Sequence, residues 1–310
     1  MADRLKQLRV VDPVLTSLAR GYRNAQFIGE ALFPVAYMDK EAGVIPLFGK
    51  EAFLLWETER AIRAQSNVMT PGDDDELDVV LREHDLAYPV DYREQAEAMF
   101  DAEKRGSRRV VDGLDLGREV ACAKLAQNPA TYLTGAKVAL AGASQWSNNG
   151  GDPVGAVETG KEVIRSRIGV RPNTMLMGAS VYASLKFHTK LTAALGADDK
   201  KVLTIEHLKA LFGVERIVIG EALAATSPKA ATSDIWGDNL MLAYVAQPAA
   251  GEQADYETPS FGYTLRRKGM PEIDTYPGAG GKVRYVRNTD IYKPVVVGAD
   301  AGYLISDINA

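Results

Sequence analysis

Apolar and polar positions alternate in two runs near the end of the chain, and this alternation predicts half-buried strands. Residues 262–266 read Gly-Tyr-Thr-Leu-Arg, and residues 281–287 place charged side chains on either side of Val283 and Tyr285. Successive side chains of a strand point to opposite faces, so a period of two indicates one covered face and one exposed face. Shorter apolar runs at 293–297 and 303–305 predict further strands.

A helical period replaces this alternation over residues 91–127. Apolar residues recur there at three- and four-residue spacing, and Asp91 followed by Glu94 fits a capping box at the start of a helix. Asn128-Pro129 ends the pattern, since the residue before a proline disfavours helical geometry. Glycines weaken a helix, and we expect this one to bend or break near Gly106.

Short buried strands and capped helices follow, and together they predict a compact α/β unit over residues 170–247. We expect a helix at about 153–168 ending at Gly169, and another over 204–213 with Thr204 and Gly213 as its caps. The remaining elements expected are strands at 174–177, 216–220 and 239–246, a helix at 180–188 and a small-residue loop at 224–233.

The first 42 residues have no such regularity and are interpreted as an arm. Short apolar clusters alternate with basic residues, among them Arg4, Arg9 and Arg20, inside a chain that is acidic as a whole. A segment of this kind cannot bury its apolar side chains alone. We therefore expect the body of the protein or a neighbouring chain to cover it.

Residues 43–90 are expected to form a long protruding hairpin. Pro46 lies in its first extended run, and a proline cannot donate to a strand ladder, which predicts an edge position. Thr70-Pro71-Gly72 is a strong turn signal. The acidic run that follows it is expected at the tip of the hairpin and consists of Asp73, Asp74, Asp75 and Glu76.

The composition is that of an ordinary globular protein and excludes several classes. The chain has 310 residues, 46% of them hydrophobic, a formal net charge of -5 and a single cysteine. This charge argues against a dedicated DNA-reading domain, and one cysteine excludes an intrachain disulfide. No run of 18 apolar residues occurs, so no membrane helix is expected. These features predict a reducing, cytoplasmic setting.

Candidate chemistry is nearly absent from the sequence. None of the three histidines (His84, His188, His207) lies at metal-ligand spacing from another, and Cys122 is interpreted as a small buried helix residue. Pro277-Gly278-Ala279-Gly280-Gly281-Lys282 lacks the flanking residues of a phosphate loop and is interpreted as a turn between strands. The acidic run lacks calcium-loop spacing. We therefore expect no catalytic, cofactor or metal site, which favours a structural role over an enzyme built on residues 170–247.

The order of the predicted elements, an arm, a hairpin, a long helix, a compact α/β unit and returning strands, resembles the Hong Kong 97-type coat fold. That is the α+β fold of the major capsid proteins of tailed double-stranded DNA bacteriophages. Motifs that are similar to those of the family are Ser144-Gln145-Trp146-Ser147, Ile168 to Thr174, Leu185 to His188, Leu208 to Val214, Gly220-Glu221-Ala222, Ile235-Trp236-Gly237 and Pro259 to Tyr263.

The resemblance implies a division of the chain. It would comprise an N-terminal arm (1–42), an E-loop (43–90), a peripheral P-domain with its spine helix (91–169), an axial A-domain (170–258) and P-domain return strands (259–310). It also implies self-assembly into hexamers and pentamers of an icosahedral head that encloses double-stranded DNA. An encapsulin-like nanocompartment shell, which shares the fold, is the alternative.

Partners also follow from the resemblance. The arm begins at Met1, so a separate scaffolding protein is expected, together with a portal protein and, in some heads, a decoration protein. Contact with packaged DNA is expected to be weak and non-specific, and no membrane is involved. The protein would reside in the virion capsid after assembly in the host bacterial cytoplasm. No isopeptide crosslink is assigned.

Intersubunit contacts are expected from charged side chains of the arm and of the acidic hairpin tip, and from basic groups elsewhere in the chain. Exposed ion pairs are worth only about 0.2–1 kcal/mol each, yet many copies of them set register. The candidates are Arg4, Arg9, Arg20, Asp73, Asp74, Asp75, Glu76, Arg108, Arg109, Arg266 and Arg267.

Overall fold

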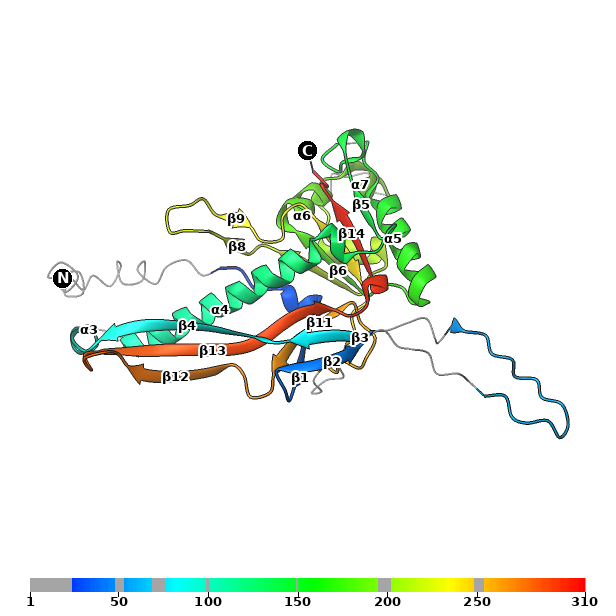
Figure 1. Cartoon of the computed structure of the whole chain (residues 1–310). Helices are drawn as coiled ribbons and strands as arrows, with labels where there is room; N and C mark the ends of the chain where they lie inside the picture. The colour runs from blue at the N-terminus through cyan, green and yellow to red at the C-terminus, as the bar shows by residue number, and fades with distance from the viewer. Residues whose placement is uncertain are drawn as a thin grey trace.

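The computed structural model describes residues 24–47, 53–68, 76–98, 101–148, 150–194, 202–247 and 254–309. Two sheets of five strands dominate this part of the chain, and two small two-stranded sheets project from it. One large sheet is elongated and carries a long helix, and the other forms the centre of a compact unit (Figure 1). The described part of the chain therefore has a body of two parts, each built on one of the five-stranded sheets.

The elongated sheet is built on one long strand, β13 (Val283–Val296). The first half of β13 lies between β12 (Glu272–Pro277) and β4 (Arg82–Asp91), and its second half pairs with β11 (Gly262–Arg267). The outermost strand, β1 (Val35–Met38), runs parallel to β11. The predicted strands at 262–266 and 281–287 are present, but β11 is not half-buried as expected, because its first five residues are buried on both faces of the sheet. Strand β12 lies in a segment for which no strand was predicted.

The predicted helix over residues 91–127 is two helices, α3 (Tyr92–Glu97) and α4 (Ala102–Ala126). Asp101 separates them, because its carboxylate accepts the backbone N–H groups of Glu103 and Lys104 and so caps a new helix. Gly106 is not the point of the break. A Cβ at this position would lie 2.8 Å from a ring carbon of Tyr88, so glycine here lets α4 approach strand β4 closely.

The compact unit follows the prediction for residues 170–247 but recruits strands from outside it. Its sheet has the order β5-β14-β10-β6-β7, with helices α5, α6 and α8 packed against the sheet or one another. The bounds are β5 (Lys137–Ala139), α5 (Pro153–Ile168), β6 (Thr174–Gly178), α6 (Ala179–Lys186), α7 (Thr189–Ala194), α8 (Ile205–Phe212), β7 (Arg216–Gly220), β10 (Leu240–Ala243) and β14 (Gly302–Ser306). Thr204 and Gly213 cap α8, and Gly169 caps α5, as predicted.

The C-terminal segment does not return as a whole to the elongated sheet. Its last strand, β14, lies inside the compact sheet between β5 and β10. The first four residues of β14 are buried, which a strand achieves most easily at an interior position of a covered sheet. Helix α5, which was expected in the peripheral part, likewise packs against β10 and β14. Short helical turns, η1 (Gly29–Ala31), η3 (Pro129–Thr131), η4 (Gly142–Ser144) and η5 (Ala299–Ala301), complete the connections.

The predicted hairpin over residues 43–90 is present in outline. Strands β2 (Ala42–Pro46) and β3 (Glu76–Val80) pair antiparallel at its base, and Pro46 lies at the edge of this small sheet, as expected. Residues 53–68 extend far from the body (Figure 1). Glu76 opens β3 opposite Pro46 and so lies in the paired base rather than at the tip, while Asp73, Asp74 and Asp75 lie outside the described residues.

A second small hairpin lies above the middle of α4. Its strands are β8 (Leu223–Ala224) and β9 (Ser233–Asp234), within the segment predicted as a small-residue loop. The hairpin projects from the body on the side where the first described residues of the chain lie (Figure 1). Asn24 and this hairpin are neighbours, because the Asn24 side chain bonds Leu223, which lies 199 residues later in the chain.

Candidate assembly site

The projecting segment 53–68 exposes large apolar side chains. Leu55, Ile62 and Val68 are 101%, 94% and 84% exposed, and the chain around them contributes no core of its own. Three further side chains on the segment are also exposed: Phe53, Leu54 and Trp56. A monomeric protein rarely leaves such a concentration of apolar surface in water, so this segment has the character of a binding surface.

The predicted arm contacts Arg4, Arg9 and Arg20 lie outside the residues that the structure describes, as do Asp73, Asp74 and Asp75. Among the described candidates, Arg108 and Arg109 are exposed on α4. The opposite side of α4 packs on β4 and β13. These two arginines are therefore available to a neighbouring chain.

Arg267 is also at the surface, where it pairs with Glu41 at 2.6 Å, and both side chains are about half exposed. Arg266 is placed differently from the expectation, because its guanidinium pairs with Asp290 at 2.8 Å and is only 8% exposed. The period of two in β11 explains the difference, since neighbouring side chains point to opposite faces of the sheet. The charge of Arg266 is therefore paired within its own subunit and not with a neighbouring chain.

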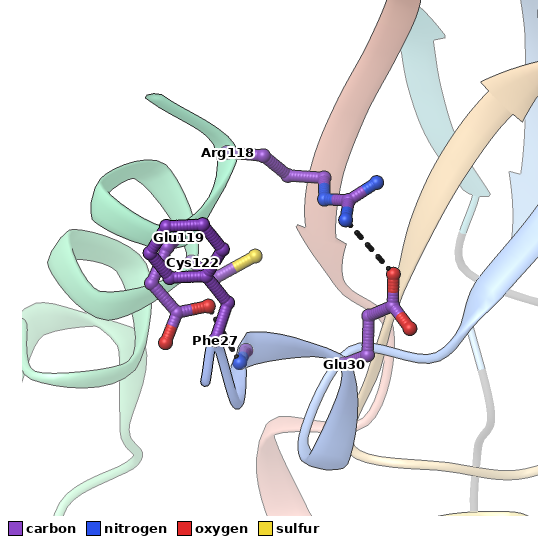
Figure 2. Close-up of a pocket in the computed structure, with 6 residues that line it drawn as sticks. Phe27, Glu30, Arg118, Glu119 and Cys122 are labelled. Carbon is purple, nitrogen blue, oxygen red and sulfur yellow. Dashed lines mark hydrogen bonds and ion pairs between the residues drawn. The ribbon is translucent and has the colours of Figure 1, made fainter. Parts of the chain in front are cut away.

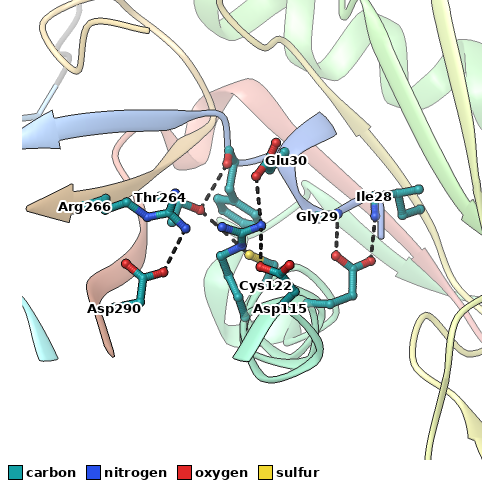
Figure 3. Close-up of polar contacts among 11 residues, drawn as sticks. Ile28, Gly29, Glu30, Asp115, Cys122, Thr264, Arg266 and Asp290 are labelled. Atoms are coloured by element: carbon teal, nitrogen blue, oxygen red, sulfur yellow. Dashed lines mark hydrogen bonds and ion pairs between the residues drawn. The ribbon is translucent and has the colours of Figure 1, made fainter. Parts of the chain in front are cut away.

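A buried carboxylate fixes the place where the arm reaches the body. Glu119 on α4 is 3% exposed and accepts the backbone N–H groups of Ile28 and Gly29 at 2.9 and 2.7 Å. The indole N–H of Trp236 donates to the same carboxylate at 2.6 Å. Figure 3 shows the two backbone groups aimed at it. Hydrogen bonds to a charged group are the strong ones, which makes this contact a firm anchor.

A second contact holds the segment just before this anchor. The Asn24 side chain donates to the carbonyl oxygen of Leu223 at 2.8 Å and accepts the N–H of Leu223 at 3.0 Å. An amide side chain that bonds both groups of one residue imitates a neighbouring strand. The root of the arm (residues 24–31) is therefore attached both to α4 and to the β8–β9 hairpin.

Charged side chains surround this root. Arg118 lies 3.0 Å from Glu30 and 3.3 Å from Asp115, and the buried pair of Arg266 and Asp290 lies beside them (Figure 3). Burial raises the pKa of Asp115 above its ordinary value, and the nearby Arg118 only partly opposes this. The Asp115 carboxyl, whose pKa is raised, therefore takes up a proton at a higher pH than an ordinary aspartate as the pH falls.

A cavity of about 120 Å³ lies beside the anchor, lined by Phe27, Gly29, Glu30, Arg118, Glu119 and Cys122 (Figure 2). Pockets that bind small organic molecules usually measure about 300–1,000 Å³, so this one is small for such a ligand. Burial raises the pKa of the Cys122 thiol to about 12. Cys122 is thus a neutral buried side chain, as predicted, and not a thiolate.

The three histidines contact neighbouring side chains or are buried in the fold. His84 stacks on Tyr292, with ring centroids 4.4 Å apart, and His207 forms a reciprocal capping contact with Thr204. His188 is buried, and burial lowers its pKa. Over the described ranges, no group of three His, Cys, Asp or Glu side chains is arranged to hold a metal ion.

The glycine-rich segment at 277–282 is a turn between β12 and β13, as predicted. Gly280 and Gly281 have φ angles of +84° and +67°, which favour glycine. No described helix has both the length and the apolar character that crossing a membrane requires.

The sequence did not single out Glu119, which is the central residue of the anchor. One signal was present, because Glu119 shares a helix face with the buried residues Cys122, Ala123 and Ala126. A lone carboxylate on an apolar face requires donors, and the sequence could not show which ones.

Comparison with known proteins identifies the family. Residues 31–287 match the family model described as phage major capsid protein E. The chain belongs to the phage major capsid protein E family. The match covers the projecting hairpin, α4 and the compact unit up to β10, so it includes strands of both large sheets.

Two relatives support this assignment along nearly the whole chain. The major capsid protein of Burkholderia phage BcepMu is 50% identical over 306 residues, which is 99% of each chain. The crystal structure of a phage-related protein from Bordetella bronchiseptica RB50 matches with a TM-score of 0.76 and 34% identity, over 97% of this chain and 98% of that one. Members of this family are structural proteins of the phage head, not enzymes.

More distant structures share only the fold. The encapsulin of Synechococcus elongatus PCC 7942 matches over 97% of this chain and 96% of its own, with a TM-score of 0.50 and 10% identity. A structure from Microbacterium phage Oxtober96 matches with a TM-score of 0.57 and 15% identity, over 92% of each chain. The fold is therefore the expected Hong Kong 97-type fold, and the family assigns the chain to a tailed-phage capsid, where it self-associates.

Proposed function

We propose that this capsid protein builds a closed icosahedral shell of hexamers and pentamers around double-stranded DNA, and that the projecting segment 53–68 holds neighbouring subunits together. The observation that carries this proposal is the exposure of apolar side chains on residues 53–68. Burial of apolar area contributes about 25 cal/mol per Å². A neighbour that covers Leu55 and Ile62 removes from water a surface that the subunit itself leaves bare.

Charged residues would determine how neighbouring subunits align with one another. The acidic run Asp73–Glu76 of one subunit would face basic groups such as Arg108 and Arg109 of another, which are exposed on α4. Pairs of this kind contribute little energy singly, about 0.2–1 kcal/mol, and are weakened by salt. Weak, repeated contacts let a misplaced subunit leave and rebind, which suits the assembly of a large shell.

Other partners follow from the requirements of a head. A separate scaffolding protein would guide assembly in the host bacterial cytoplasm, a portal protein would occupy one vertex, and a decoration protein would add to the outer surface. A net charge of -5 suits a wall that contacts packaged DNA weakly and without sequence preference. Strong phosphate binding would hinder both packaging and ejection.

Replacement of Leu55 and Ile62 by serine tests the proposal. The subunit should fold with an unchanged melting temperature, because neither side chain contributes to the core. Shell formation, followed by electron microscopy and sedimentation, should fall by tenfold or more. A matched control replaces Val80, which is exposed on β3 in the paired base of the hairpin, by serine.

Normal shells from the double variant would overturn the role of the segment. Micrographs also separate the two shell types. Large DNA-filled heads with one distinct vertex support the proposal, whereas small closed shells around a protein cargo would favour the encapsulin-like alternative.

A further inference from the structure

Glu119 lies at a point where, within the described part of the chain, three hydrogen-bond donors converge and no acceptor does. Ile28 N–H and the Trp236 indole both donate to Oε1, and Gly29 N–H donates to Oε2. Because every partner donates, the position requires an acceptor on both oxygens, which only a carboxylate provides. An amide at this position would turn an –NH₂ group toward an N–H group.

The donors come from two segments that lie far apart in the sequence. Ile28 and Gly29 belong to the root of the arm, 91 and 90 residues before Glu119. Trp236 follows strand β9 of the small hairpin, 117 residues after it. The carboxylate is therefore a shared anchor for two segments, and the loss of either one changes what the other binds.

Close packing fixes both segments on the anchor. A Cβ at Gly29 would lie 2.8 Å from Glu119 Oε2 and 2.9 Å from Cys122 Cβ, so the backbone of the root is pressed against α4. A Cβ at Gly220, the last residue of β7, would lie 2.3 Å from the Trp236 ring. Trp236 is thus held between the compact sheet and Glu119, with 0% of its surface exposed.

We propose that Glu119 is a positioning residue that couples the root of the arm (residues 24–31) to the β8–β9 hairpin, so that the two are ordered together. Asn24 reinforces the coupling, because it bonds Leu223 of the same hairpin. The direction in which the arm leaves the body is then set by the compact unit. The coupling is a property of the subunit, and its consequence for assembly rests on the proposed function.

Hydrogen–deuterium exchange of the full-length protein tests the coupling, with all variants compared in the same assembly state. In Glu119→Gln, exchange should rise by about 10–100-fold in residues 24–31 and also in residues 222–236, as expected for the loss of hydrogen bonds to a buried charge. Protection in the remainder of α4 and in β6 and β10 should stay unchanged. Unchanged protection of the amides of Ile28 and Gly29 would overturn the assignment.

Trp236→Phe is the decisive variant and also serves if Glu119→Gln does not fold. It removes one donor from Glu119 and leaves the two arm donors untouched. Coupling predicts at least a threefold rise in exchange at Ile28 and Gly29. Trp146→Phe is the matched control, because Trp146 is equally buried and its indole N–H has no hydrogen-bond partner within the described structure. A rise confined to residues 222–236 in Trp236→Phe would show that the segments are independent.

Discussion

Charged side chains that are removed from water in this protein differ in how well their partners compensate them. Glu119 accepts hydrogen bonds from three donors, and the guanidinium of Arg266 pairs with the carboxylate of Asp290. Asp115 is different, because its partner Arg118 also binds Glu30 and does not fully offset the cost of burial. A charged group taken from water without full compensation favours its neutral form.

Asp115→Asn tests this imbalance. Burial raises the pKa of Asp115, so the ionised carboxylate costs stability at neutral pH, and that cost disappears below the ordinary pKa of 3.8. We expect the variant to melt on the order of 1 °C higher than the parent at pH 7 and at the same temperature near pH 3.5. Differential scanning calorimetry across this range measures the difference.

Asp112→Asn provides the control, because Asp112 is exposed on the same helix. It should show no such pH-dependent gain. A lower melting temperature for Asp115→Asn at pH 7 would mean that the ion pair with Arg118 outweighs the cost of burial.

The end of a helix can be predicted from the sequence where a nearby residue bonds the backbone groups that the helix leaves unpaired. The caps of α8, Thr204 and Gly213, were predictable because both act within a few residues. The predicted break at Gly106 was wrong, because a glycine weakens a helix without ending it, whereas the carboxylate of Asp101 caps a new helix. Gly106 instead serves the contact with Tyr88, which is tertiary information.

Asp101→Ala tests the cap of α4. The alanine cannot accept the N–H groups of Glu103 and Lys104, so the first turn should fray and the melting temperature should fall by about 2–4 °C. Circular dichroism measures both the helicity and the melting temperature. A variant that melts with the parent would show that packing alone fixes the start of α4.

Asp101→Asn separates the cap from the charge, because the amide oxygen still accepts a hydrogen bond. The backbone N–H of Lys104 lowers the pKa of Asp101, so its stabilisation is present above pH 3.8 and is lost as the pH falls further. The asparagine variant should keep most of the stability at pH 7 and lose this acid dependence.

The whole molecule consists of a body that completes its own core and of extensions that do not. Ile28, Gly29 and Ala31 are buried, so the root of the arm belongs to the body. The projecting segment 53–68 is the opposite case, with apolar side chains in water. Folding and assembly therefore depend on different residues, which makes them separable by mutation.

Deletion of residues 1–23 tests this separation, since it ends before Asn24 and spares the anchor at Glu119. The truncated subunit should keep its melting temperature within about 2 °C. Its yield of closed shells, counted by electron microscopy, should fall severalfold. Shells at the full yield would show that the arm has no part in assembly. Deletion of residues 1–31 is the contrasting variant, and it should destabilise the fold because Ile28 and the Glu119 anchor are lost.

The sequence by itself determined what depends on near neighbours: the presence of strands β11 and β13, the caps of α5 and α8, and the order of hairpin, helix and α/β unit. Its motifs also sufficed for the resemblance to the capsid fold. Only the tertiary structure decided that β14 enters the compact sheet, that Arg266 turns inward and that Glu119 joins the arm to the β8–β9 hairpin. The physical reason is range, because periods and caps act over a few residues whereas these contacts join groups from 24 to more than 100 residues apart.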